Sequence, residues 1–179
     1  MNKVFLITLV VFGSLTSQAQ RSSCKNLVAA IKSKNNRQVT HILKTVKADC
    51  IYRSGEPRTP LIAASRNGSL QIVKLLIKEN AKIEFHADGD ESALMAAAAN
   101  GHLDIVKYLI EKKVKVNKII RGDGTALISA VRNNNYQIAK ILLENGADVD
   151  LYARSDEYPM FHARANKNKK MIALLKKHQ

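Results

Sequence analysis

The chain has 179 residues, of which 29 are Lys or Arg and 15 are Asp or Glu, so its formal net charge is +14. This length suits one domain, and the single long apolar run, at the N-terminus, excludes a protein with several membrane-spanning helices. The excess of positive charge favours acidic partners.

The N-terminal segment has the features of a secretory signal peptide. Lys3 is followed by an apolar run at residues 4–12, and residues 17–19 offer small side chains to a signal peptidase. We therefore expect a signal peptide at 1–19, cleavage after Ala19, and a periplasmic or secreted product. An uncleaved anchor is the alternative, although the run is shorter than the roughly 20 residues that span a bilayer.

From residue 59 onward the sequence repeats with a period of 33 residues, and each copy has two apolar blocks in a constant register. The first blocks are residues 59–64, 92–97, 125–130 and 158–163, and the second blocks are residues 72–77, 105–110 and 138–143. Two short helices and a turn at this period are typical of a solenoid, because one such unit cannot bury its own apolar face.

Helix-boundary signals recur in the same register. Thr59, Ser92 and Thr125 stand where a side-chain oxygen can cap the first helix of a copy. Gly68 and Gly101 follow the first helices and suit a left-handed helix end. The residues at 20–179 are therefore predicted to form a stack of helix pairs.

These blocks resemble ankyrin repeats. The resemblance is carried by Thr-Pro-Leu-Ile-Ala-Ala at 59–64, Asn-Gly-His at 100–102 and Gly-Ala-Asp-Val-Asp at 146–150. It implies an all-α ankyrin-repeat solenoid of paired antiparallel helices with hairpin-like turns, of about five repeats including two degenerate caps. The repeats would lie at about 24–53, 54–86, 87–119, 120–152 and 153–179.

The chain departs from the family pattern at one position of every repeat. The family's histidine is replaced by Ile62, Met95, Ile128 and Phe161, so a polar link between neighbouring turns is exchanged for apolar packing. The lead-in segments at 89–91, 122–124 and 155–157 are similar to those of some bacterial exported ankyrin proteins.

The two cysteines of an exported chain predict one disulfide. Residues 27–31 and 39–43 fit the two helices of the N-terminal repeat, so Cys24 would precede the first helix and Cys50 would follow the second. Because the start of one helix lies beside the end of the other in a helical hairpin, the bond would hold this repeat closed. The alternative is a reactive cysteine that works with His41.

The sequence offers no pattern of catalytic or metal-binding residues. The five histidines lack the spacing of a metal site, and nucleophile-elbow and phosphate-loop motifs are absent. His102 is interpreted as a hydrogen-bonding residue of a turn, and residues 122–125 as a turn that leads into a helix cap. We therefore expect a protein that is not an enzyme and that needs no cofactor.

The resemblance implies that partners bind a concave face made of hairpin tips and first helices. Tip residues expected there are Tyr52, Arg53, Arg58, Phe85, His86, Ile119, Arg121, Tyr152 and Arg154, with Arg66, Ala99, Arg132 and Ala165 from the first helices. Exposed aromatic and arginine side chains are typical of binding hot spots. Alternatively, the apolar tip residues pack on neighbouring tips. The lysines, such as Lys74, Lys107 and Lys140, are expected on the second helices, which form the convex side.

The expected function is non-catalytic binding of another exported protein by a monomer, with no membrane insertion after signal cleavage. The partner would be an exported enzyme, acidic or acting on the cell wall, that the chain regulates, inhibits or protects against. One alternative is binding of an anionic polymer, such as lipopolysaccharide, teichoic acid or nucleic acid. Nucleic acid is the least expected of these, because no basic channel lined by aromatic residues is evident. A second alternative is an effector secreted into a host cell, and a third is an enzyme with an unrecognised site.

Overall fold

The computed structural model describes residues 23–54, 56–85, 91–152 and 158–179. The predicted signal peptide at 1–19, His86 and Arg154 lie outside these residues, and so do the side chains of Arg53 and Arg58.

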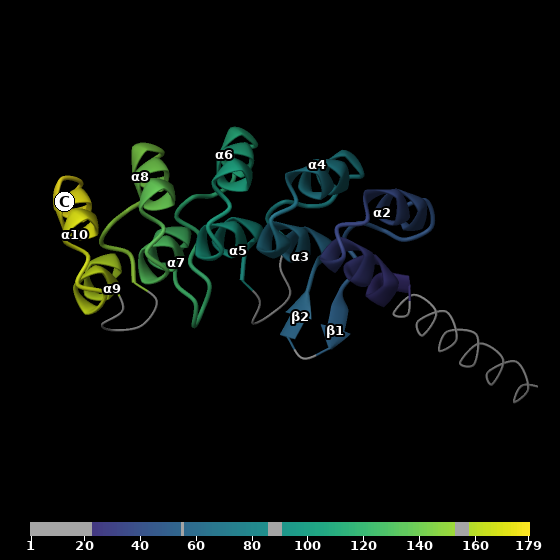
Figure 1. Ribbon diagram of the computed structural model, residues 1–179, viewed down its shortest axis with the longest axis horizontal. Helices are drawn as coiled ribbons and strands as arrows, with labels where there is room; N and C mark the ends of the chain where they lie inside the picture. The colour runs from purple at the N-terminus through teal and green to yellow at the C-terminus, as the bar shows by residue number, and fades with distance from the viewer. Residues whose placement is uncertain (1–22, 55, 86–90, 153–157) are drawn as a thin grey trace, which may run out of the picture.

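The described residues form pairs of short antiparallel helices, which confirms the predicted all-α solenoid (Figure 1). The N-terminal pair is a helix at residues 23–32 with α2 (Asn36–Ile42). The following pairs are α3 (Pro60–Asn67) with α4 (Leu70–Lys78), α5 (Ala93–Ala99) with α6 (Leu103–Glu111), α7 (Ala126–Arg132) with α8 (Tyr136–Glu144), and α9 (Pro159–Ala165) with α10 (Lys169–Lys176). Strands β1 (Tyr52–Ser54) and β2 (Glu56–Arg58) make a short antiparallel hairpin in which Tyr52 lies opposite Arg58.

The helices stack in two rows. Helices α3, α5, α7 and α9 lie side by side in an inner row, and α2, α4, α6, α8 and α10 form an outer row (Figure 1). The β1–β2 hairpin and the loop between α6 and α7 project from the inner row on the side away from the outer helices. The stack therefore has a hairpin side and an outer-helix side, as the repeat pattern predicts.

Each of the three central inner helices starts at a capping side chain. The Thr59 hydroxyl accepts a hydrogen bond from the Ile62 N–H at 3.3 Å. The hydroxyls of Ser92 and Thr125 accept equivalent bonds from the N–H groups of Met95 and Ile128, each at 3.2 Å. These bonds satisfy backbone donors that a helix start otherwise leaves unpaired. The equivalent residue of α9, Tyr158, makes no such side-chain cap.

One continuous core runs between the rows. Ala64, Ala96 and Ala97 are fully buried, which lets neighbouring inner helices approach closely. Ile62 and Ile128 are 0% exposed, so two of the residues that replace the family's histidine are completely buried. Such burial is worth about 1.5–3 kcal/mol for each large aliphatic side chain.

Polar side chains link each repeat to the helix ends of the preceding one. His102 Nε2 donates to the carbonyl oxygen of Arg66 at 3.0 Å, and Asn135 Nδ2 donates to that of Ala98 at 2.7 Å. In the interfaces on either side of these two, the equivalent hydrogen bond comes from an asparagine that lies two positions earlier in the repeat. These bonds run from Asn67 to Ile31 at 2.9 Å and from Asn166 to Arg132 at 3.0 Å. The prediction that His102 is a hydrogen-bonding turn residue is confirmed.

A second set of links joins the ends of the outer helices. The Asp49 carboxylate accepts from the Lys82 backbone N–H at 2.7 Å, and the Glu84 carboxylate accepts from that of Lys115 at 2.8 Å. The Lys118 ammonium also contacts Glu84 Oε2 at 3.1 Å. Successive repeats are thus fixed to one another at two levels besides their apolar contact.

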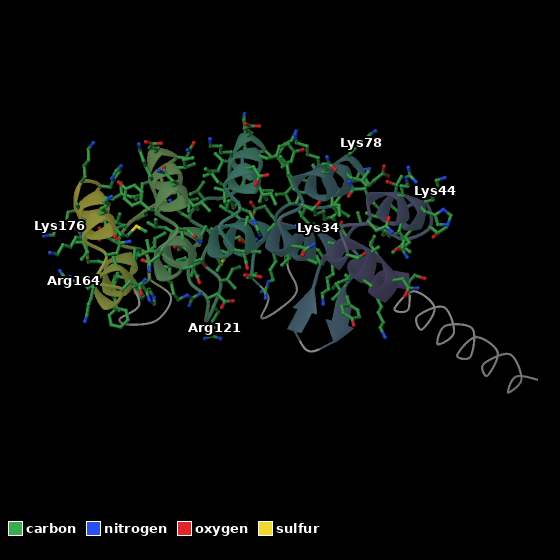
Figure 2. The ribbon with its side chains drawn as sticks, viewed as in Figure 1. Lys34, Lys44, Lys78, Arg121, Arg164 and Lys176 are labelled. Carbon is green, nitrogen blue, oxygen red and sulfur yellow. A yellow bond between two sulfur atoms is a disulfide. The ribbon has the colours of Figure 1, made fainter. Side chains whose placement is uncertain are left out.

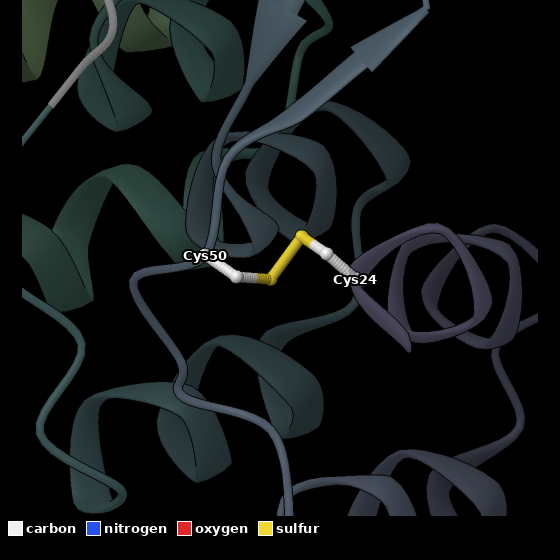
Figure 3. Close-up of a disulfide and its surroundings, with 2 residues drawn as sticks. All are labelled: Cys24 and Cys50. Carbon is white, nitrogen blue, oxygen red and sulfur yellow. A yellow bond between two sulfur atoms is a disulfide. The ribbon is translucent and has the colours of Figure 1, made fainter. Parts of the chain in front are cut away.

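A disulfide joins Cys24 and Cys50, whose Cα atoms lie 5.9 Å apart (Figure 3). Cys24 is 1% exposed and lies within the helix at 23–32, not before a helix as the sequence suggested. Cys50 lies just before β1. The bond therefore ties the first helix to the base of the first hairpin and closes the N-terminal repeat.

Candidate binding surface

Ile119 and Tyr152 are the most exposed of the apolar tip residues that the sequence singled out, at 49% and 50%. Ile119 precedes a tight turn, in which the backbone groups of Ile120 and Gly124 exchange two hydrogen bonds of 2.9 Å. Ile120 is 4% exposed. The chain thus buries one isoleucine and leaves its neighbour in solvent, on the side to which the loop projects.

Arg121 follows this pair at the tip of the loop (Figure 2). Arg121 is exposed and lies two residues after Ile119 in the turn. Arginine presents several donors in a planar group that can hold a carboxylate at two points. This loop therefore offers an apolar side chain, Ile119, and a cation that can bind a carboxylate, Arg121, two residues apart.

Two other expected tip residues are less accessible. The side chains of Tyr52 and Phe85 are half-buried, whereas those of Ile119 and Tyr152 are exposed. Tyr52 packs against the edge of the core. This contact of Tyr52 is with the core and is therefore different from the packing of tips on neighbouring tips that the alternative interpretation expects. We name the set Tyr52, Phe85, Ile119, Arg121 and Tyr152 the hairpin face.

The arginines of the inner helices differ in their surroundings. Arg66 forms an ion pair with Glu91, which includes a 2.8 Å bond from Nε to Oε1 and bridges α3 to the segment before α5. Arg66 therefore has fewer guanidinium N–H groups left to bind a partner. Arg132 is exposed in the last turn of α7. Ala99 is half-buried and Ala165 is exposed, and neither contributes a polar group.

The outer helices carry exposed lysines. Lys74 and Lys112 both lie with their ammonium groups 5.4 Å from the centre of the Tyr108 ring. The Lys140 ammonium nitrogen lies 3.8 Å from Oε1 of Glu144, one turn further along α8. Figure 2 shows Lys44 and Lys78 on the same outer side. Lysines outnumber carboxylates on this side, although α6 and α8 also carry Asp104, Glu111 and Glu144.

Among the described residues, no three His, Cys, Asp or Glu side chains are grouped as a metal ion would require. Within the same part of the chain, no helix has both the length and the apolar character needed to cross a bilayer.

The comparison with protein families decides the assignment. A family model described as "Ankyrin repeats (3 copies)" matches residues 27–120 and 83–153. The chain belongs to the ankyrin repeat family. No curated protein matches the chain in a sequence search. Ankyrin repeats form a non-catalytic module for protein–protein interaction, so the partner is a protein.

The structure also reveals a surface that the sequence interpretation missed. On α9, the last described inner helix, Phe161 is 52% exposed, and Tyr158 just before the helix is 36% exposed. The signal was present, because Phe161 occupies the position of the buried residues Ile62 and Ile128. An apolar residue at a stacking position of the terminal pair could have been flagged.

Proposed function

We propose that this ankyrin protein is exported and captures another exported protein through its hairpin face. By holding that partner it regulates or inhibits an exported enzyme, or protects the cell against one. The observation that carries the proposal is the half-exposed pair Ile119 and Tyr152 at successive loops, with Arg121 beside the first. Large apolar side chains next to arginine are the chemistry of interface hot spots.

Two features support the compartment. The apolar run at residues 4–12 and the small residues at 17–19 are those of a signal peptide. The disulfide between Cys24 and Cys50 suits an oxidising environment, because thiols in the cytosol are kept reduced. A binder in that compartment meets exported enzymes and not cytosolic ones, which favours a cell-wall enzyme as partner.

The surface charge supports a second candidate, the binding of an anionic polymer. The outer helices present Lys74, Lys107, Lys112 and Lys140, although Lys107 has Asp104 and Glu111 on its own helix and Lys140 is paired with Glu144. This arrangement attracts polyanions over a range that salt shortens. It lacks the tightly placed donors that would fix one ligand, so the protein partner is the better supported candidate.

The test is capture of a partner from the native exported fraction by the processed protein and by two variant sets. The first set, Ile119→Ala with Tyr152→Ala, should reduce affinity at least about a hundredfold, since each hot-spot residue contributes about 2 kcal/mol or more. The second set changes Lys74, Lys107 and Lys140 to Gln and should mainly slow association, most visibly at low salt. Loss of capture in the lysine set alone would instead support the anionic polymer.

A further inference from the structure

The turns that join each inner helix to its outer partner lie in a row along one edge of the stack. Because the helices of a pair are antiparallel, this edge is at the helix ends opposite to those from which the loops between repeats emerge. Consecutive turns are linked by the hydrogen bonds described above. Two further bonds run from Asn36 Nδ2 to Gln71 Oε1 at 2.6 Å and from Asn168 Nδ2 to Asn134 Oδ1 at 3.2 Å. We name this row the turn edge, and it consists of residues 32–37, 67–71, 100–104, 133–137 and 166–170.

The positive charge of the turn edge is confined to its first and last turns. These two turns carry exposed cations and no carboxylate, and the cations are Lys32, Lys34, Arg37, Lys167, Lys169 and Lys170. The turns between them contain no lysine or arginine, and their one acidic residue is Asp104. None of the ion pairs found among the described residues involves the cations of the turn edge. They are therefore available to a partner.

The exposure of these cations does not depend on their place in the last helix pair. Lys167 and Lys170 are one period after Asn134 and Gln137. Those two residues are exposed although a further repeat packs beside them. Positions of the turn edge thus remain in solvent in the middle of the stack as well as at its ends.

Two of the cations have a backbone conformation that destabilises lysine. The left-handed residue of the three middle turns is Gly68, Gly101 or Asn134. In the first and last turns it is Lys34 and Lys167, with φ of 54° and 52°. Glycine adopts this conformation without the steric strain that a Cβ causes. Lysine thus replaces a more stable choice in the same two turns that carry the other cations, which indicates a role in binding and not in folding.

The distance between the two cationic turns limits which partner can contact both. Figure 1 shows α2 and α10 at opposite ends of the stack, and helices that pack about 8–10 Å apart place the outermost turns roughly 30–40 Å from each other. A small anion reaches one turn only. A linear polyanion also carries charge between its ends, where the turn edge offers Asp104 and no cation. A bilayer surface meets both turns, because anionic lipids diffuse within it and gather beneath them.

The turn edge is suited to contact with a bilayer but not to insertion into it. The exposed large apolar side chains of the described chain are all elsewhere, at Ile119, Tyr152, Tyr158 and Phe161. Attraction to such a surface is therefore electrostatic, and each lysine or arginine near the headgroups raises the partition coefficient roughly fivefold. One cationic turn binds weakly, whereas the two together act as a bivalent unit.

We propose that the turn edge holds the protein on a bilayer surface that contains anionic phospholipid, with its first and last turns against the headgroup phosphates. The loops that carry Ile119 and Tyr152 lie at the other helix ends and stay free. The inference does not rest on the proposed function, because it concerns other residues and another class of ligand.

The experiment measures cosedimentation of the processed protein with vesicles. It should bind vesicles made of equal parts of phosphatidylglycerol and phosphatidylcholine, less tightly as salt is raised, and should not bind phosphatidylcholine alone. Lys34→Gly combined with Lys167→Gly should lower the partition coefficient at least about tenfold. The same variant should have a higher melting temperature, because glycine relieves the left-handed strain. Weaker binding by a more stable protein cannot be attributed to a damaged fold.

A matched control removes two lysines from the outer helices and leaves the turn edge unchanged. Lys74→Gln combined with Lys140→Gln should lower the partition coefficient by about threefold or less. Equal losses in the control and in the glycine variant would overturn the proposal, since total charge would then decide binding. Equal binding to neutral vesicles would also overturn it. Soluble polyphosphate that binds more tightly than the vesicles, at the same phosphate concentration, would make the ligand a free polyanion instead. None of these results affects capture through Ile119 and Tyr152, so the two proposals fail separately.

Discussion

Single residues at the turns determine how closely the repeats pack. Gly68 has a φ of +74°, and a Cβ at this position would overlap the imidazole ring of His102. That ring is held in place by its hydrogen bond to the Arg66 carbonyl. Two separate constraints therefore require glycine at position 68. One is the left-handed backbone conformation, and the other is the closeness of His102 from the neighbouring repeat.

The chain contains a matched control for this requirement. Gly146 has a similar φ of +83°, but a Cβ there would meet nothing within 4 Å. Gly146→Ala should lower the free energy of unfolding by about 1 kcal/mol, the cost of a left-handed alanine. Gly68→Ala should lower it by about 1–3 kcal/mol more, because the interface is overpacked.

Urea unfolding of both variants measures the difference, and it should largely disappear when the two changes are compared in a His102→Ala background. Equal losses for Gly68→Ala and Gly146→Ala would show that the ring of His102 is not a steric neighbour.

At the scale of elements, much of the helix pattern follows from the sequence. Capping residues such as Thr125 and apolar blocks such as residues 138–143 act within one repeat, and local signals of this kind can be read without the fold. The expected hairpin-like turn at Tyr52 is also present, as two short strands.

The parts that could not be predicted depend on neighbouring repeats. The ion pair of Arg66 joins residues 25 positions apart, and no local pattern indicates it. Tyr52 becomes half-buried because the adjacent core edge is available to it. Phe161 is exposed because α9 is the last described inner helix, although the pattern around it is that of a buried position.

The N-terminal helix pair depends on the disulfide. Cys24 and Cys50 are 26 residues apart in sequence, and closing a loop of that length stabilises a protein by about 3–4 kcal/mol in the chain-entropy model. Changing both cysteines to serine should therefore lower stability by about this amount. Hydrogen exchange should report the loss first at residues 23–49, and mass spectrometry after alkylation should find no free thiol in the unchanged protein.

If the double serine variant lost protection evenly along the whole stack, the bond would not be a local closure of the first repeat.

At the scale of the whole molecule, stability arises from contact between repeats. Ile128 and Phe161 occupy the same register position, yet one is 0% and the other 52% exposed. Ile128→Ala should lower the free energy of unfolding by about 2–5 kcal/mol and reduce hydrogen-exchange protection in the pairs on both sides. Phe161→Ala should lower it by less than about 1 kcal/mol. Loss of protection confined to α7 and α8 in the Ile128 variant would contradict stacking as the main source of stability.

The two long sides of the molecule differ in chemistry, and this difference underlies the proposed function. The loops present Ile119 and Tyr152 on one side, and the outer helices present lysines such as Lys74 and Lys107 on the other. Steering by the lysines and contact at the loops can act on the same acidic partner, because the first affects association rates and the second affects how long the complex lasts.

The most direct measurement is a hydrogen-exchange footprint of the captured partner on the processed protein. Binding through the hairpin face should slow exchange at residues 117–124 and 149–152 and leave α4, α6 and α8 unchanged. Slowed exchange along α4, α6 and α8, with the two loops unaffected, would contradict the proposal and place the binding site on the outer helices.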